Sequence, residues 1–249
     1  MIEREQGDDG ILTLRLAHGK ASAMDVELLD GMIRELDAAG DARAVILTGT
    51  GSIFSAGVDL FRLSDGGEAY VRRFIPLLRD FVLRMFAFPK PVVVAANGHA
   101  IAGGGVMVMA GDYRMMADGK GRLGVPELLV GVPFPAAALE AVRFAVPGDR
   151  IQSLVFTGRT FAPREALAER LVDEVVAAEA LRDRAREVAA QLAALAPDAF
   201  RLTKEYLRGP SIERIRASAA YDEQVLAAWT APETHARIRD YLERTVRKG

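Results

Sequence analysis

The chain has 249 residues, of which 50% are hydrophobic and 27% are charged, and this balance excludes the fibrous, disordered and membrane-spanning classes. Its 32 basic and 34 acidic residues give a net charge of −2, which offers no general attraction for nucleic acid or for a membrane surface. The absence of cysteine removes disulfides, thiol nucleophiles and thiolate metal sites. The mixed charges of Met1 to Glu5 indicate no signal peptide, so we expect a cytoplasmic protein.

The first two thirds of the chain alternate short apolar runs with helical patterns. Leucines at every second position predict a half-buried strand over 11–16. Asp25, a favoured N-cap residue, precedes a helical pattern that stops at Gly40. Further strands are predicted over 44–47, 91–96, 113–117 and 122–124, and a long helix over 69–86. This alternation is typical of an α/β fold with a mainly parallel sheet.

The character of the sequence changes beyond Ala178. Four successive amphipathic helices are predicted over 181–195, 198–207, 212–229 and 232–246. They indicate a separate helical layer or an oligomerisation module.

Two loops that follow buried strands allow the backbone to approach a ligand closely. The first is Phe54 to Leu60, and the second is Asn97 to Gly105, which ends in three glycines that open a helix. The first N–H groups of a helix are unpaired, and two such donors aimed at one oxygen would form an oxyanion hole. When composition is considered alone, tight turns and close packing explain glycines of this kind better than a ligand site does.

A third segment, Gly124 to Pro133, places the single carboxylate of Glu127 among apolar neighbours. Desolvation there would raise the pKa of the acid and suit it for removing a proton from carbon. The competing interpretation is that Glu127 caps the short helix that begins after Pro126.

Together these segments resemble the crotonase, or enoyl-CoA hydratase/isomerase, superfamily over essentially the whole chain. Ser55 to Asp59 is similar to the first oxyanion segment of that family, and Asn97 to Gly105 is similar to the second. Asp112 to Ala117 and Pro126 to Gly131 follow in the family's order and spacing. Four motifs in register make the resemblance specific.

The resemblance implies a spiral core domain of strand–strand–helix repeats over 1–195 and a C-terminal helical oligomerisation region over 196–249. It also implies a homotrimer, or a dimer of trimers. No nucleic acid or membrane partner is expected. The expected substrate is an acyl-CoA thioester, so CoA is part of the substrate, and neither a separate cofactor nor a metal is expected.

The resemblance also assigns site residues. It implies that the N–H groups of Ala56 and Gly104 hold the enolate oxygen and that Glu127 moves the proton. CoA contacts are implied for five residues: Lys20, Ala21, Asp59, Tyr241 and Arg244. Tyr241 and Arg244 lie in a segment similar to one that reaches the CoA of a neighbouring subunit in related enzymes.

One departure from the family pattern decides the predicted reaction. Hydratases of the family carry two glutamates, and the first of these positions is Met107 here. A thioether cannot move a proton, whereas one carboxylate is enough to shift a double bond. We therefore predict a 3-enoyl-CoA to 2-enoyl-CoA isomerase.

The alternatives are a weak or specialised hydratase and a CoA-binding paralogue without activity. Decarboxylation and thioester hydrolysis on the same scaffold stay open, whereas a dienoyl-CoA isomerase would need further carboxylates. A serine hydrolase built on Ser55 and His99 is disfavoured, because the glycine that a nucleophile elbow places two residues before the serine is absent.

Overall fold

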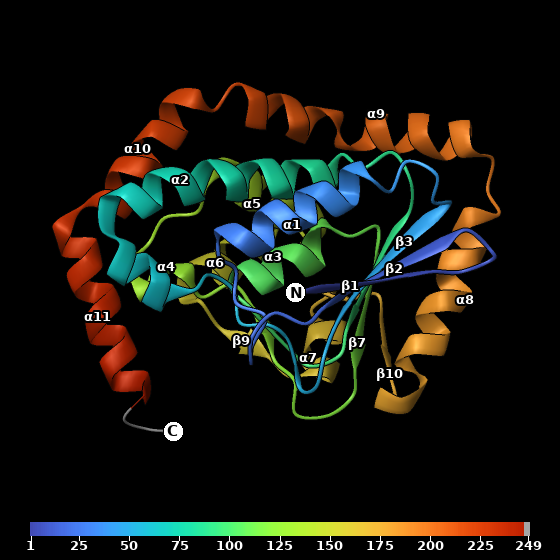
Figure 1. Cartoon of the computed structure of the whole chain (residues 1–249), viewed down its shortest axis with the longest axis horizontal. Helices are drawn as coiled ribbons and strands as arrows, with labels where there is room; N and C mark the ends of the chain where they lie inside the picture. Colours follow the sequence, from blue (N-terminus) through green and yellow to red (C-terminus); the bar gives the residue numbers. More distant parts are fainter. Residues whose placement is uncertain (247–249) are drawn as a thin grey trace.

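The computed structural model describes residues 1–246. The chain folds into two sheets that are surrounded by helices (Figure 1). The last three residues of the predicted region 196–249 lie outside the described residues. The boundary at 195 stays a prediction, although a helix does begin nearby at Pro197. Within residues 1–246, none of the helices combines the length and the apolar character that crossing a bilayer requires.

The larger sheet has six strands in the order β1-β2-β3-β5-β7-β10. Apart from the antiparallel pair β1 and β2, its neighbouring strands run parallel, as the alternation in the sequence predicted. The strands are β1 (Ile2–Gln6), β2 (Ile11–Leu16), β3 (Ala44–Gly49), β5 (Val92–Ala96), β7 (Tyr113–Ala117) and β10 (Glu174–Val176).

The smaller sheet has the order β4-β6-β8-β9 and gives the fold its repeats. Its strands are β4 (Ile53–Ser55), β6 (His99–Ile101), β8 (Leu123–Gly124) and β9 (Thr160–Phe161). Each of β4, β6 and β8 follows a strand of the larger sheet and precedes a helix, so the expected strand–strand–helix repeats are confirmed. The predicted strand over 122–124 is β8, whereas β6 lies inside a segment that the sequence presented as a loop.

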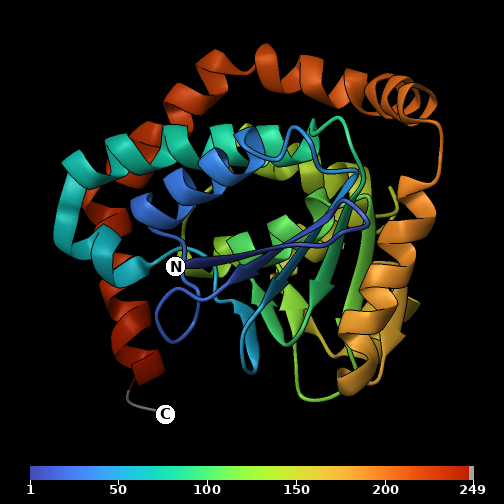
Figure 2. The ribbon, with the colours of Figure 1, turned by 45° about the vertical axis from the view of Figure 1, so that its right-hand side comes forward.

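Seven helices accompany the repeats and four close the chain. The first group is α1 (Val26–Asp37), α2 (Leu60–Phe86), α3 (Gly103–Ala110), α4 (Glu127–Val130), α5 (Ala136–Ala145), α6 (Ile151–Thr157) and α7 (Pro163–Ala168). The second group is α8 (Leu181–Ala193), α9 (Pro197–Arg216), α10 (Ala219–Thr230) and α11 (Pro232–Val246). Figures 1 and 2 both place α9 across the top of the molecule, above α2, and α8 alongside the larger sheet.

The prediction that β2 is half-buried was wrong, because both of its faces are covered. Leu12 and Leu14 belong to the main hydrophobic cluster. Ile11, on the opposite face, packs in a second cluster with Ala185 and Val188 of α8. Helix α8, which is distant in sequence, therefore covers the face of β2 that the sequence analysis expected to be exposed.

Helix boundaries differ from the prediction at three places. At the first, the predicted helix over 212–229 is divided, because α9 ends at Arg216 and α10 begins at Ala219. Helix α2 begins at Leu60 instead of residue 69, and its early part is set off by a kink at Gly67, where φ is +57°. Helix α9 runs through Pro210, where the sequence predicted a gap between residues 207 and 212. Buried Arg208 and Ser211 hold α9 on the core at both sides of Pro210, so tertiary contacts override the local helix-breaking tendency.

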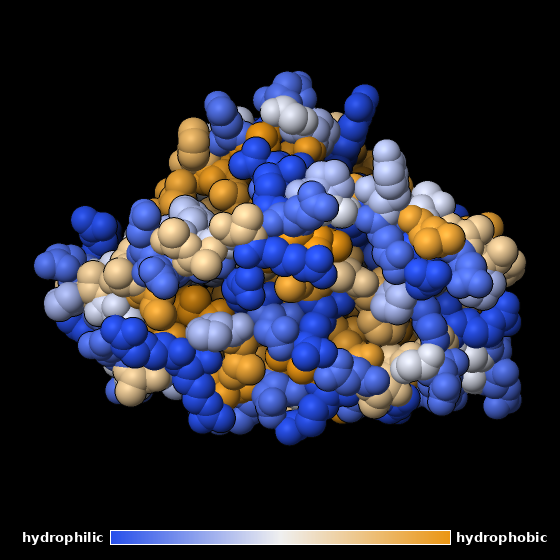
Figure 3. All heavy atoms as spheres, turned by 90° about the horizontal axis from the view of Figure 1, so that it is seen from above, coloured by the Kyte–Doolittle hydropathy of each residue, from blue (hydrophilic) through white to orange (hydrophobic). Residues whose placement is uncertain are grey.

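The α9 side of the molecule exposes apolar side chains. Figure 3, a view from above, shows hydrophobic atoms lying between hydrophilic ones on this face. Leu202, Tyr206 and Leu207 of α9 are among the exposed apolar residues, and Tyr206 is 87% exposed.

Candidate active site

The glycine triplet 103–105 opens α3 at a point where three segments of the chain meet. Each glycine lies close to a different segment, and at Gly104 and Gly105 the near atoms are backbone, so a side chain would not fit there without a shift. A Cβ at Gly103 would lie 2.6 Å from the Met24 sulfur, and a Cβ at Gly104 would overlap with the Ser55 carbonyl oxygen. A Cβ at Gly105 would lie 2.5 Å from the carbonyl oxygen of Gly124. The packing explanation of the triplet is therefore confirmed, whereas its role as an oxyanion donor stays a prediction.

Backbone hydrogen bonds join the loop before α1 to the first predicted oxyanion segment. The N–H of Met24 donates to the Gly57 carbonyl at 2.7 Å, and the N–H of Asp59 donates to the Met24 carbonyl at 2.9 Å. The N–H of Ala56 donates to the carbonyl of Ala21 at 3.0 Å. The structure thus brings together three residues that the resemblance assigned to the site, and it engages one of the two predicted oxyanion donors.

The two predicted donors, Ala56 and Gly104, differ in availability. Gly104 lies in the first turn of α3, where N–H groups have no acceptor within the helix, and no acceptor in residues 1–246 binds its N–H. Ala56 is an exposed residue, but its N–H is bonded to the Ala21 carbonyl. A ligand oxygen would therefore find Gly104 free and would have to take the place of the Ala21 carbonyl at Ala56.

Glu127 is the first residue of α4 and is only 8% exposed. Burial raises the pKa of its carboxyl to about 8. Its Oε2 atom is buried and has no hydrogen-bond partner within the described chain. Glu127 does lie in the first turn of α4, as the helix-capping alternative requires, but that placement does not account for a buried oxygen with no partner. The carboxyl group is therefore dry, basic for a glutamate and free to interact with a ligand.

The strand β8 ties the segment of Glu127 to the glycine triplet. Ile101 pairs with Gly124 in the smaller sheet, and the N–H of Ala102 donates to the Gly124 carbonyl at 2.9 Å. Gly105 packs on the same carbonyl, three residues before Glu127. These contacts position the acid relative to the start of α3.

Met107 lies one turn beyond the start of α3 and is 2% exposed. All eight residues of α3, Gly103 to Ala110, are buried. The position where the family's hydratases carry their first glutamate is therefore a buried thioether in a helix that is apolar on every side.

The other residues that the resemblance assigned to CoA binding lie on the surface or pack against the chain's own core. Lys20 is exposed, and Asp59 caps α2 by accepting the N–H of Arg62 at 3.0 Å. Tyr241 is half-buried against the main hydrophobic cluster, and Arg244 is exposed, with its Nε bonded to a backbone carbonyl of the same helix. Their roles toward CoA stay predictions.

Ser55 has a structural role. Its buried hydroxyl donates to the Ser22 carbonyl at 2.7 Å and accepts the N–H of Gly57 at 3.2 Å. A hydroxyl committed to two backbone groups is not poised as a nucleophile, which argues further against a serine hydrolase.

An ionic network that the sequence did not reveal fixes the loop before α1. The carboxyl of Asp25 lies 2.6 Å from His18 Nε2 and 2.5 Å from the guanidinium of Arg62, which also binds Glu27. Burial of Asp25 raises its pKa, but hydrogen bonds from His18, the Leu28 amide and Arg62 outweigh that effect and lower the pKa overall. The only sequence signal was Asp25 as an N-cap, which the structure confirms.

Comparisons with known proteins identify the family and the fold of this chain. A model of the enoyl-CoA hydratase/isomerase family matches residues 6–247. A Thermus thermophilus protein whose name places it among the enoyl-CoA hydratases is 35% identical over 215 residues, which cover 83% of each chain. The mitochondrial enoyl-CoA delta isomerase 1 of Rattus norvegicus is 27% identical over 254 residues, which cover 100% of this chain and 88% of the relative. The solved structure of human mitochondrial delta3-delta2-enoyl-CoA isomerase has the same fold, with a TM-score of 0.94 at 24% identity over 99% of this chain and 98% of that one.

Proposed function

The chain belongs to the enoyl-CoA hydratase/isomerase family, and within it we propose that this protein is a 3-enoyl-CoA to 2-enoyl-CoA isomerase. The observation that carries the proposal is the buried, unpaired carboxyl oxygen of Glu127, whose pKa is raised to about 8. A second carboxylate is missing from the hydratase position, where Met107 is buried instead.

In the proposed reaction, ionised Glu127 removes a proton from C2 of the substrate. The electrons of the broken C–H bond move into the thioester and form a dienolate. Glu127 then returns the same proton to C4, so that the double bond shifts from position 3 to position 2 and the carboxylate is regenerated. One carboxyl group performs both proton transfers.

The dienolate oxygen needs stabilisation while the proton is on the acid. The free N–H of Gly104 supplies one hydrogen bond, and the N–H of Ala56 supplies the second once the thioester oxygen replaces the Ala21 carbonyl. The packing of Gly104 on Ser55 holds these two donors in adjacent segments.

The apolar surroundings support isomerisation over hydration. Helix α3 is wholly buried, and Met107 offers no group to hold or activate water. Exclusion of water also protects a dienolate from protonation by solvent at the wrong carbon.

We extend the proposal to substrate binding and assembly. CoA is proposed to contact Lys20, Ala21 and Asp59, and Tyr241 and Arg244 are proposed to serve the site of a neighbouring subunit. This arrangement requires a homotrimer or a dimer of trimers, which sedimentation velocity would detect.

A weak or specialised hydratase is the second candidate, because the Thermus thermophilus relative carries a hydratase name. The deciding experiment offers purified protein a 3-enoyl-CoA and a 2-enoyl-CoA in separate reactions. An isomerase converts the first into a conjugated thioester and leaves the second unhydrated. Hydration of the second substrate without conversion of the first would overturn the proposal. A protein that binds acyl-CoA but converts neither substrate would be an inactive paralogue.

A further inference from the structure

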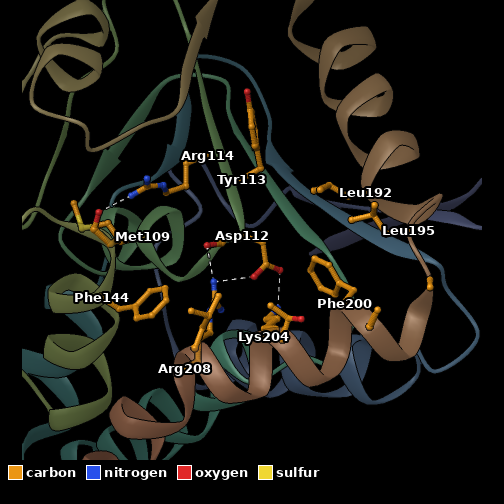
Figure 4. A pocket seen from close by; sticks show the side chains of 16 residues that line it. Met109, Asp112, Tyr113, Arg114, Phe144, Leu192, Leu195, Phe200, Lys204 and Arg208 are labelled. Atoms are coloured by element: carbon orange, nitrogen blue, oxygen red, sulfur yellow. Dashed lines mark hydrogen bonds and ion pairs between the residues drawn. The ribbon is translucent and has the colours of Figure 1, made fainter.

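A cavity of about 530 Å³ lies apart from the residues of the candidate active site. It is bounded by α9, the end of α8, the start of β7 and the end of α5 (Figure 4). Its apolar wall comes from six side chains: Met109, Phe144, Leu192, Leu195, Phe200 and Leu207. The volume is within the range of cavities that hold small ligands.

Two buried cations share one carboxylate at this cavity. Lys204 Nζ lies 2.6 Å from Asp112 Oδ2, and an Arg208 terminal nitrogen lies 2.8 Å from Asp112 Oδ1. The Lys204 and Arg208 side chains are 7% and 4% exposed. Figure 4 shows both reaching Asp112 from α9. Arg114, also at the cavity, is neutralised by Asp173 at 2.7 Å. The group therefore carries one excess positive charge.

The donors of the two cations are not used to the same extent. The terminal nitrogens of Arg208 bind Asp112 and the carbonyls of Phe86, Ala110 and Gly111. Lys204 binds Asp112 and, at 3.2 Å, the carbonyl of Lys90, and its Nζ lies over the Phe200 ring, 5.8 Å from the centroid. One of its three protons therefore has no nitrogen or oxygen acceptor in the described chain. Burial lowers the pKa of Lys204 to about 8, because the charged form is poorly solvated. A bound anion would stabilise that charged form.

We propose that this cavity binds a monocarboxylate with a long apolar chain, its carboxylate on Lys204 and its chain along the apolar wall. A single excess charge matches a monoanion, and the wall matches an aliphatic chain. A purely structural role, in which the side chain holds α9 on the core, explains why Arg208 is buried, because its terminal nitrogens are all bonded. That role does not explain the unbonded proton of Lys204 or the cavity beside it.

Dodecanoate is a suitable probe, and calorimetric titration measures its binding to the full-length protein. K204M removes the excess charge and leaves the Asp112–Arg208 pair, so we expect dodecanoate affinity to fall by about tenfold or more. Dodecanol, which has no charge, should bind K204M and wild type alike. Circular dichroism checks that K204M is folded.

A second pair of variants tests the location without disturbing the buried charges. Ala199 is exposed and lines the cavity, so A199W should block dodecanoate binding. Ala190 is exposed on α8 and lies outside the cavity lining, so A190W should bind normally and serves as the matched control.

Two outcomes would overturn the proposal. Unchanged dodecanoate affinity in both K204M and A199W would place any binding elsewhere, including the acyl site at Glu127. Absence of dodecanoate binding to wild type, with A199W but not A190W shifting the oligomeric state in sedimentation velocity, would show that a second copy of the chain covers the cavity.

Discussion

The α-carbon of Gly104 lies against the backbone of Ser55, so closely that a Cβ at position 104 would overlap with the Ser55 carbonyl oxygen. This contact joins the start of α3 to the segment that carries Ala56. It holds in adjacent segments the two amides that we propose as oxyanion donors.

We expect G104A to separate these segments. The free energy of unfolding should fall by about 1–3 kcal/mol because the added methyl group meets backbone, and isomerase activity should fall further because a donor moves. Urea denaturation and initial rates measure the two effects. G209A is the control, since position 209 is helical with open space around it, and it should raise stability by about 1 kcal/mol. Wild-type stability and activity in G104A would contradict this account.

The activity should depend on pH through Glu127. The reaction needs its carboxylate form, and the pKa of the carboxyl is raised to about 8 by burial. We therefore expect kcat/KM for a 3-enoyl-CoA to rise from pH 6, to reach half its maximum near pH 8 and to level off only above about pH 9. A profile that is flat over this range would show that the free enzyme does not hold Glu127 protonated.

Replacing the acid should abolish activity and stabilise the fold. In the unfolded chain Glu127 ionises near its ordinary pKa of 4.5, whereas in the folded chain it keeps its proton to about pH 8. The free energy of unfolding of the wild type should therefore fall as the pH rises from about 4.5 to about 8. E127Q should be more stable than wild type by a few kcal/mol at pH 8, and the difference should vanish below about pH 4. Thermal unfolding across pH measures this, and a difference that is independent of pH would refute it.

The identity of residue 107 should control hydration. M107E restores a second carboxylate in α3, so we expect it to hydrate a 2-enoyl-CoA, measured as loss of absorbance by the conjugated thioester. M107Q, similar in size and polarity but unable to move a proton, should not. If folded M107E also fails to hydrate, the identity of residue 107 does not decide between isomerisation and hydration.

The Asp112 carboxylate should be a major contributor to stability. D112N leaves two buried cations without their counterion, so we expect a loss of about 3–5 kcal/mol in urea denaturation. The exposed pair of Arg201 and Glu205 is the comparison, and E205Q should change stability by less than about 1 kcal/mol. Equal effects of the two substitutions would mean that burial does not set the strength of these ion pairs.

Local patterns predicted elements well where a single segment carries its own signals. Asp25 accepts the Leu28 amide as the N-cap of α1, and β3, β5 and β7 lie where apolar runs placed them. Errors arose where distant segments decided the outcome. Helix α8 buries the second face of β2, and Arg208 and Ser211 carry α9 through Pro210.

The sequence by itself determined the family, the order of the repeats and the single carboxylate, because these reside in contiguous motifs. Only the tertiary structure decided that Ala21 engages the Ala56 amide, that the Glu127 carboxyl is dry and unpaired, and that Lys204 and Arg208 meet at Asp112. Such features join residues far apart along the chain, so they depend on how all the intervening elements pack.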